Sequence, residues 1–158
     1  MTDCEFFMSR WETERPLTLK VVRSLPAEKL DYRPHPRSRS AAELAALLAY
    51  EAQAMVEMFD YGKVEWNEPK PGKLDDTIIA LQLANQQVLD RFRKFSDDAW
   101  AKKIQFFVNG TVAMEETFGE MMWGTFFDTI HHRGQLSAYI RPMGGKVPSI
   151  YGPSADEE

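Results

Sequence analysis

The last third of the chain carries its densest group of chemically active side chains. Asp128 and His132 stand four residues apart, and an α-helix brings residues at this spacing onto one face. A carboxylate and an imidazole on one inward face can share a divalent metal ion such as zinc or nickel. The same two groups can instead hydrogen-bond to each other and hold the helix in register, and an isolated pair favours this plainer interpretation.

A third candidate ligand, Glu51, lies far upstream on a stripe of apolar residues. It follows Leu47 by four residues and precedes Met55 by four, so the stripe predicts a buried carboxylate. Burial of a lone carboxylate is costly unless it is paired. Two positions remain open: Glu51 faces His132 or a metal ion, or it sits at the edge of the stripe. Asn85 interrupts a later stripe and either joins a polar network or sets helix register.

The other reactive residues give weaker signals. His131 is rotated by about 100° from His132 around the helix axis, so we expect it near a loop or at the surface. Arg133 is expected to face solvent or the C-terminal tail. Cys4 has no histidine or basic residue close to it in sequence, and no nucleophilic role is predicted for it. The sequence contains no glycine-rich phosphate loop, nucleophile elbow or CxxC pair.

Four amphipathic segments must position these residues. Helical periodicity predicts helices near residues 5–24, 40–60, 75–95 and 117–141. Capping boxes mark two of the starts, Ser40 with Glu43 and Thr117 with Glu120, and Ser9 with Glu12 would form a third if the first helix starts late. Pro16 falls inside the first segment, where it predicts a kink or a later helix start.

The connections complete the predicted fold. Residues 63–73 contain two prolines and a glycine and are expected to form a loop. Asn109-Gly110 stands between two short apolar runs, which predicts a β-hairpin just before the last helix. The pattern therefore predicts an all-α fold, a four-helix bundle with a short β-hairpin, built as a single domain over residues 1–158.

Composition narrows the classes of function. The chain has 158 residues, one cysteine and a net charge of −5, a balance that disfavours a broad nucleic-acid footprint. No apolar run is long enough for a membrane span. The single cysteine suits a reducing compartment, and the acidic stretch Met1–Glu5 is unlike a secretory signal. We therefore expect a cytoplasmic protein that binds neither nucleic acid nor membrane.

Several stretches together resemble one family, the DinB / YfiT-like superfamily of metalloenzymes. The resemblance covers nearly the whole chain and rests on the following residues: His131–Arg141, Val147–Gly152, Leu25-Pro26, Tyr32-Arg33-Pro34 and Ser40–Leu44. It implies a four-helix bundle, often dimeric, with a metal site made of three histidines. One of those histidines belongs to the second helix, and two belong to the fourth helix, four residues apart.

Only part of that ligand set is kept in this sequence. The last histidine of the family matches His132, the first ligand of the fourth helix falls on Asp128, and the ligand of the second helix falls on Leu47. A carboxylate can still bind a metal ion, whereas leucine cannot. Glu51, one turn further along the second helix, is the candidate replacement for the lost histidine.

Two hypotheses follow for the function. In the first, a divalent metal ion held by His132, Asp128 and Glu51 activates a thiol or a water molecule. Activation of a thiol would suit an S-transferase-like reaction, since relatives in the family include thiol-dependent S-transferases and isomerases. Activation of water would suit a hydrolytic reaction. In the second, the bundle is metal-free and serves as a stress-related dimer or binds a small ligand without catalysis. Leu47 favours the second hypothesis, whereas Asp128 and His132 favour the first.

The expected oligomer is a homodimer. Apolar residues on the outer faces of the first and fourth helices predict an exposed surface that a second copy can cover. Trp123 and Gly134 lie on the fourth helix, where they would allow close approach of the partner.

Overall fold

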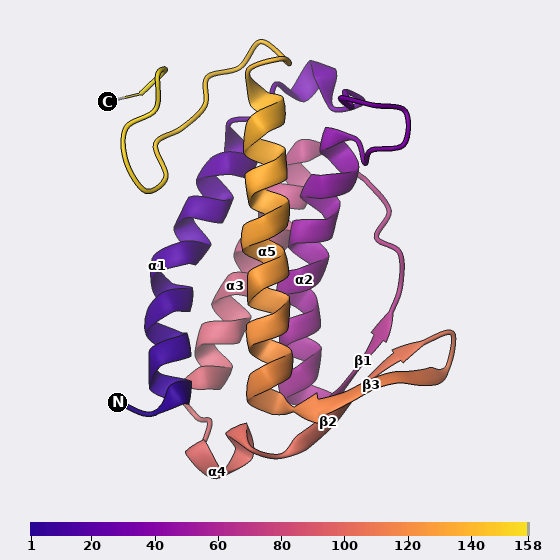
Figure 1. Cartoon of the computed structure of the whole chain (residues 1–158), viewed down its shortest axis with the longest axis vertical. Coiled ribbons are helices and arrows are strands. Elements are labelled where there is room, and N and C mark those ends of the chain that lie inside the picture. The colour runs from indigo at the N-terminus through magenta and orange to yellow at the C-terminus, as the bar shows by residue number, and fades with distance from the viewer. Residues whose placement is uncertain (158) are drawn as a thin grey trace.

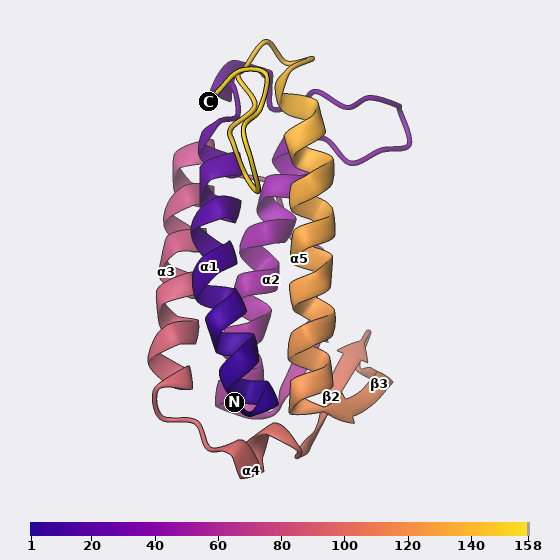
Figure 2. The ribbon, with the colours of Figure 1, turned by 60° about the vertical axis from the view of Figure 1, so that its left-hand side comes forward.

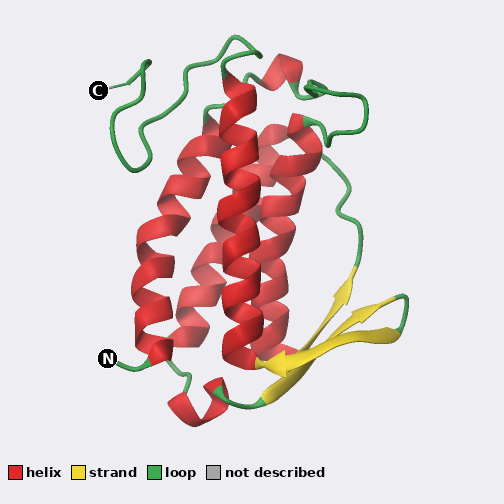
Figure 3. Cartoon of the chain, in the orientation of Figure 1, coloured by secondary structure: helices red, strands yellow, loops and turns green. Residues whose placement is uncertain are grey.

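The computed structural model describes residues 1–157, which form four long helices, two short helical turns and three strands. The long helices lie side by side along the long axis of the molecule (Figures 1 and 3). Their bounds are α1 (Asp3–Arg23), α2 (Ala41–Tyr61), α3 (Leu74–Phe92) and α5 (Phe118–Ile140). The short turns are η1 (Ala27–Lys29) and α4 (Asp97–Trp100). All four predicted long helices are present within a few residues of their expected positions.

Capping boxes begin three of the long helices, and two of them are the predicted ones. Ser40 with Glu43 caps α2, and Thr117 with Glu120 caps α5, so side-chain oxygens satisfy backbone N–H groups of the first turn. Helix α1 begins close to its predicted position, and Ser9 with Glu12, the box expected for a late start, lies inside it. Thr2 and Glu5 form the box instead, and the helix continues through Pro16.

The strands form a small sheet in the order β1-β2-β3, so the predicted all-α class is corrected. Strands β2 (Lys103–Val108) and β3 (Thr111–Thr117) form the predicted hairpin, with positive φ angles at both Asn109 and Gly110. Strand β1 (Lys63–Trp66) pairs in parallel with β2, although its residues were expected to lie in a loop. At four residues it is too short to show a periodic pattern, and its pairing partner is distant in sequence.

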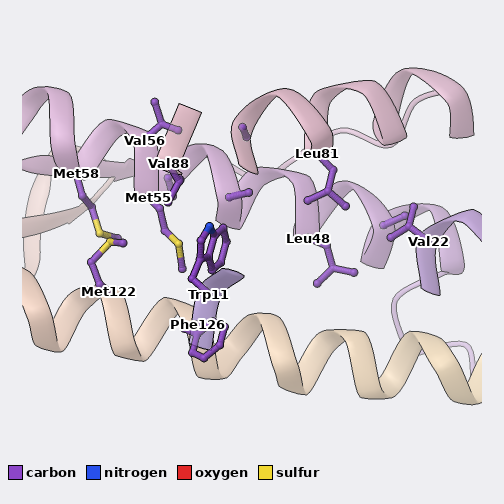
Figure 4. Packing of buried hydrophobic residues seen from close by; sticks show 14 of the residues in the cluster. Trp11, Val22, Leu48, Met55, Val56, Met58, Leu81, Val88, Met122 and Phe126 are labelled. Carbon is purple, nitrogen blue, oxygen red and sulfur yellow. The ribbon is translucent and has the colours of Figure 1, made fainter. Parts of the chain in front are cut away.

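The core lies along the axis between the long helices. Trp11 and Phe126 pack against each other, and Leu48 of α2 and Leu81 of α3 are buried in the same core (Figure 4). Burial of each such side chain stabilises the folded protein by about 1.5–3 kcal/mol. Each helix is therefore held at the rotation about its axis that buries these side chains. These rotations decide which polar residues face inward.

The C-terminal tail folds back along the upper part of α1 (Figure 2). Lys20 on α1 binds Glu157 through a 2.7 Å ion pair and donates a hydrogen bond to the Ser149 carbonyl. Arg141 binds Asp156 at 2.8 Å, which holds the far side of the tail. None of the helices in residues 1–157 is both long enough and apolar enough to cross a bilayer.

Candidate functional site

A pocket of about 210 Å³ opens between α2, α5 and the sheet. The pocket is lined by residues from α2, α5, the strands and the segment before α2. They are Leu47, Tyr50, Glu51, Ala54 and Met58 of α2, Thr125, Asp128 and His132 of α5, Trp66 and Phe106 of the strands, and Arg39. Three of the predicted functional residues, Glu51, Asp128 and His132, therefore border one cavity.

Glu51 and His132 make the shortest contact in this pocket. His132 Nδ1 lies 2.5 Å from Glu51 Oε1, and the Thr129 hydroxyl donates to Glu51 Oε2 at 2.8 Å. The Glu51 side chain is only 7% exposed, so both of its oxygens are satisfied inside the protein. Of the two predicted positions for Glu51, the inward one facing His132 is confirmed.

This contact changes the proton affinity of both partners. Burial raises the pKa of the Glu51 carboxyl above its usual value, while the hydrogen bond to His132 opposes that rise. The hydrogen bond to Glu51 raises the pKa of the His132 imidazole, against the opposing effect of burial. The pair therefore holds a proton more firmly than the two separate side chains would.

The arrangement leaves one nitrogen of His132 for a ligand. A carboxylate only accepts hydrogen bonds, so Nδ1 carries the proton that Glu51 binds. The His132 side chain remains 20% exposed and borders the pocket. Its Nε2 atom is then the nitrogen able to accept a proton from a bound molecule, as in carboxylate-oriented histidines of many active sites.

Tyr50, on the same helix as Glu51, also lines the pocket and was missed by the sequence analysis. The Tyr50 hydroxyl donates to the Glu65 carbonyl at 3.0 Å and accepts a hydrogen bond from the Asn67 backbone at 3.2 Å. Its ring packs edge-on against Trp66, with 5.0 Å between centroids. Tyr50 thus fastens β1 to α2 and keeps the wall of the pocket in place.

The predicted metal ligands do not come together as a complete set. Asp128 lies on the rim of the pocket with an exposed side chain, so its predicted interior position is wrong. Leu47 is buried in the wall and has no donor atom. Both Glu51 oxygens are engaged by His132 and Thr129.

Across residues 1–157, no group of three or more His, Cys, Asp or Glu side chains is arranged to hold a metal ion. The donor chemistry of the pocket therefore does not fit a tightly held zinc or nickel ion. Ligation by Asp128, His132 and Glu51 stays a prediction.

A second buried glutamate pairs with the residue next to His132. Arg133 is only 2% exposed and donates to Glu14 Oε2 at 2.7 Å and to the Tyr151 hydroxyl at 2.5 Å. Tyr151 in turn donates to Glu14 at 2.8 Å. Of the two predictions for Arg133, contact with the tail is confirmed and exposure to solvent is wrong.

Glu14 was missed by the sequence analysis, although a signal was present. It lies between Trp11 and Thr18 on the buried stripe of α1, as Glu51 lies between Leu47 and Met55 on α2. Helical spacing alone could have marked it as a buried carboxylate.

The other reactive residues behave largely as expected. His131 is exposed and hydrogen-bonds to Gln135 at 3.0 Å, which confirms its predicted surface position. Asn85 is buried on α3. Cys4 is also buried, and burial with nearby acidic residues raises the pKa of its thiol to about 11. A thiol with this pKa stays protonated near neutral pH, which agrees with the absence of a predicted nucleophilic role.

An open apolar groove runs between α1 and α5 on another face of the molecule. It has a volume of about 550 Å³, and the large side chains Phe6 and Phe127 are 46% and 61% exposed beside it. Trp123 is half-buried there, and its indole N–H donates to Asp3. This groove matches the apolar face predicted for a homodimer, and the dimer stays a prediction.

Comparison with known proteins identifies the family. The model of the DinB family matches residues 1–158. The chain belongs to the DinB family. This confirms the resemblance that the His131–Arg141 stretch indicated. No curated protein matches the sequence.

Solved structures support the same fold. A DinB-like protein from Bacillus cereus ATCC 10987 is 20% identical, with a TM-score of 0.76 over 93% of this chain and 97% of that one. The DinB-like protein YjoA from Bacillus subtilis is 16% identical, with a TM-score of 0.71 over 94% and 99%. A mycothiol-dependent maleylpyruvate isomerase is 14% identical, with a TM-score of 0.50 over 93% of this chain and 65% of that chain. At these identities the similarity to the solved structures shows the fold of this chain and nothing further.

Proposed function

We propose that this DinB-family protein binds a low-molecular-weight thiol in the pocket and that His132 accepts the thiol proton, so that the thiolate can attack a second substrate. The observation that carries the proposal is the 2.5 Å contact between Glu51 and His132 at the wall of an open cavity. Glu51 acts as a positioning residue, because it holds the imidazole with Nε2 toward the ligand. The reaction class is S-transfer.

The proton affinity of His132 suits a thiol. Free cysteine has a pKa of about 8.5, roughly two units above that of an ordinary histidine. The hydrogen bond to Glu51 raises the pKa of His132 and so narrows this gap. Proton transfer from sulfur to Nε2 is therefore closer to balanced, and the resulting imidazolium stabilises the thiolate beside it.

The thiol must come from solution, because Cys4 is buried and stays protonated. A reducing compartment, as predicted from the single cysteine, would keep such a thiol reduced. The structural neighbour named as a mycothiol-dependent isomerase makes thiols the first nucleophiles to test.

A resident metal ion is not required in this proposal. Asp128 and His132 alone would leave most of a zinc or nickel coordination shell to water, so that binding would be weak. Water activation by such an ion, the hydrolytic option, needs a firmly held metal. The electrostatic role that a metal would have for a thiolate falls to the His132 imidazolium instead.

The test is a conjugation assay on protein treated with a chelator. Cysteine, glutathione and mycothiol serve as thiols, and 1-chloro-2,4-dinitrobenzene serves as the electrophile whose conjugate absorbs light. We expect the wild type to accelerate conjugation of at least one thiol, and His132→Asn to lose about 10²-fold or more of that acceleration. His131→Asn is the matched control, since His131 is exposed, hydrogen-bonds to Gln135 and packs edge-on against the His132 ring without bordering the pocket.

Three outcomes would overturn the proposal. They are no acceleration with any of the thiols, loss of the rate on chelation, and equal rates for the wild type and His132→Asn. Binding of a thiol without conjugate formation would support the other hypothesis, a small-ligand-binding protein without catalytic activity.

A further inference from the structure

A second hollow joins the thiol pocket beneath the β-hairpin. It has a volume of about 420 Å³, and its own walls are Met114 on β3 and Glu120, Met121 and Gly124 on α5. Phe106, Thr125 and Asp128 border both this hollow and the pocket that contains His132. We call the second hollow the hairpin lobe. The shared residues make the two cavities neighbouring compartments.

The hairpin lobe has apolar walls and an unfilled space beside Gly124. Phe106 and Met114 are direct partners across β2 and β3, so their side chains project from the same face of the hairpin. Methionine is flexible and polarisable, and it adapts to aromatic molecules of different shapes. A Cβ atom added at Gly124 would meet nothing within 4 Å, so the missing side chain itself leaves room for a ligand.

The charges around the lobe narrow the class of ligand. Glu120 accepts hydrogen bonds from the Thr117 backbone and hydroxyl, which lowers its pKa and keeps it anionic. Asp128 adds a second carboxylate on the side shared with the pocket. Two carboxylates disfavour an anionic ligand. The apolar walls formed by Phe106, Met114 and Met121 favour an apolar molecule over a hydrated cation, so an uncharged apolar molecule fits best.

We infer that the hairpin lobe binds an uncharged, apolar electrophile, which the thiolate in the neighbouring pocket attacks. This inference rests on the proposed S-transfer function and names its second substrate. A new bond forms between sulfur and an electrophilic carbon, and the bond from that carbon to its leaving group breaks. The leaving group departs with the electron pair, and the thiol proton is held at His132 Nε2. The hairpin then serves as the specificity element of the protein.

Two glycines of α5 provide a matched pair of variants. Gly124→Phe would fill the lobe, because its side chain would extend from a position that borders the hollow. Gly134→Phe adds the same side chain to the same helix, where a Cβ atom also meets nothing within 4 Å and the residue borders neither the pocket nor the hairpin lobe. Because Gly134 was expected to allow close approach of a partner copy, sedimentation checks that this variant keeps the oligomeric state of the wild type. Replacement of a helical glycine also removes a conformational cost, so both variants are expected to fold. Circular dichroism checks this.

The experiment follows binding of 1-chloro-2,4-dinitrobenzene alone, without thiol, by NMR of ¹³C-labelled methionine methyl groups. In the wild type we expect the signals of Met114 and Met121 to shift, while those of the core residues Met55 and Met143 stay in place. Gly134→Phe should bind as the wild type does, and Gly124→Phe should weaken binding at least tenfold.

Unshifted Met114 and Met121 signals in the wild type, or unchanged binding in Gly124→Phe, would overturn the inference. His132→Asn should bind the electrophile normally. Binding in the lobe together with no conjugation by the wild type would refute the S-transfer function and leave the lobe as a ligand site. Conjugation that proceeds equally in Gly124→Phe would uphold the S-transfer function and refute the lobe.

Discussion

Two buried glutamates meet two consecutive residues of α5, with different consequences. Glu51 on α2 contacts His132, and Glu14 on α1 contacts Arg133. The His132 side chain is 20% exposed beside a cavity, whereas that of Arg133 is 2% exposed and is covered by Tyr151 of the tail. Access to the cationic partner therefore separates the two pairs more clearly than burial of the carboxylate does, since Glu14 itself borders the groove between α1 and α5.

Their proton chemistry differs as well. His132 can gain and lose a proton near neutral pH, while the Arg133 guanidinium stays charged. The Tyr151 hydroxyl also stays neutral, because burial and the hydrogen bond to Glu14 raise its pKa. A pair that can exchange a proton and reach a ligand is suited to chemistry. A pair whose cation is enclosed and permanently charged joins α1, α5 and the tail, and its role is structural.

The largest expected effect is on stability, at the Glu14–Arg133 pair. Arg133→Met removes one partner and leaves Glu14 as an uncompensated buried charge, which should lower the free energy of unfolding by about 3–5 kcal/mol. Urea denaturation measures this loss. The double variant Glu14→Gln with Arg133→Met should recover a large part of it. A cost below about 1 kcal/mol for Arg133→Met would show that the pair is not structural.

The next effect is on activity, at the open pair. Glu51→Gln keeps the shape of the side chain but removes the charge that holds and tunes His132, so the conjugation rate should fall about 10²-fold. Its unfolding free energy should change less than that of Arg133→Met, because burial already disfavours the charged form of Glu51. Steady-state kinetics and urea denaturation of the two variants settle the comparison. A large stability loss with normal activity in Glu51→Gln would reverse the roles assigned here.

A third variant, Leu47→His, tests whether the Glu51–His132 pair lies where the family binds metal. Leu47→His adds a nitrogen donor to the pocket that Asp128 and His132 border. Titration calorimetry should show zinc or nickel affinity raised at least tenfold, or about 1.4 kcal/mol, above the weak binding of the wild type. The rise should vanish when His132→Asn is added. Negligible binding by Leu47→His would mean that the match of Leu47 to the family histidine, or the reach of Asp128, is wrong.

The smallest effect concerns the pH dependence of stability. The pKa of His132 is raised on folding, so its contribution is fully present below the ordinary histidine pKa and is lost as pH rises through the folded-state value. The raised pKa of Glu51 acts in the same direction. Wild-type unfolding free energy should therefore decline as pH rises through the neutral range, and His132→Asn should flatten the decline. An equal slope in both proteins would argue against the coupling.

Local signals in the sequence predicted the long helices and one of the two glutamate pairs. Capping boxes marked the starts of α2 and α5, and an interrupted apolar stripe marked Glu51 as a partner for His132. An interrupted apolar stripe on α1 would have predicted the buried Glu14 in the same way, but the sequence analysis did not include it. These features depend on residues within one or two helical turns, so the chain shows them directly.

Features that depend on distant contacts were harder to predict. Strand β1 forms because it pairs with β2, which lies about forty residues further along the chain. No residue pattern within Lys63–Trp66 predicts that pairing. Asp128 shares a helix face with His132, but the face is broad, and the carboxylate lies at its solvated edge. The burial of Arg133 depends on Tyr151, which comes from a tail without periodicity.

The most direct test of the open pair is an NMR titration of His132 in chelator-treated protein with ¹⁵N-labelled histidine rings. We predict that Nδ1 carries the proton in the neutral form, that His132 titrates above the ordinary value of about 6.5, and that Glu51→Gln lowers the midpoint. His35, an exposed histidine in the segment before α2, serves as the internal reference and should not respond to that substitution. A His132 midpoint at or below 6.5, unchanged in Glu51→Gln, would contradict the central claim that Glu51 orients and tunes this histidine as a proton acceptor.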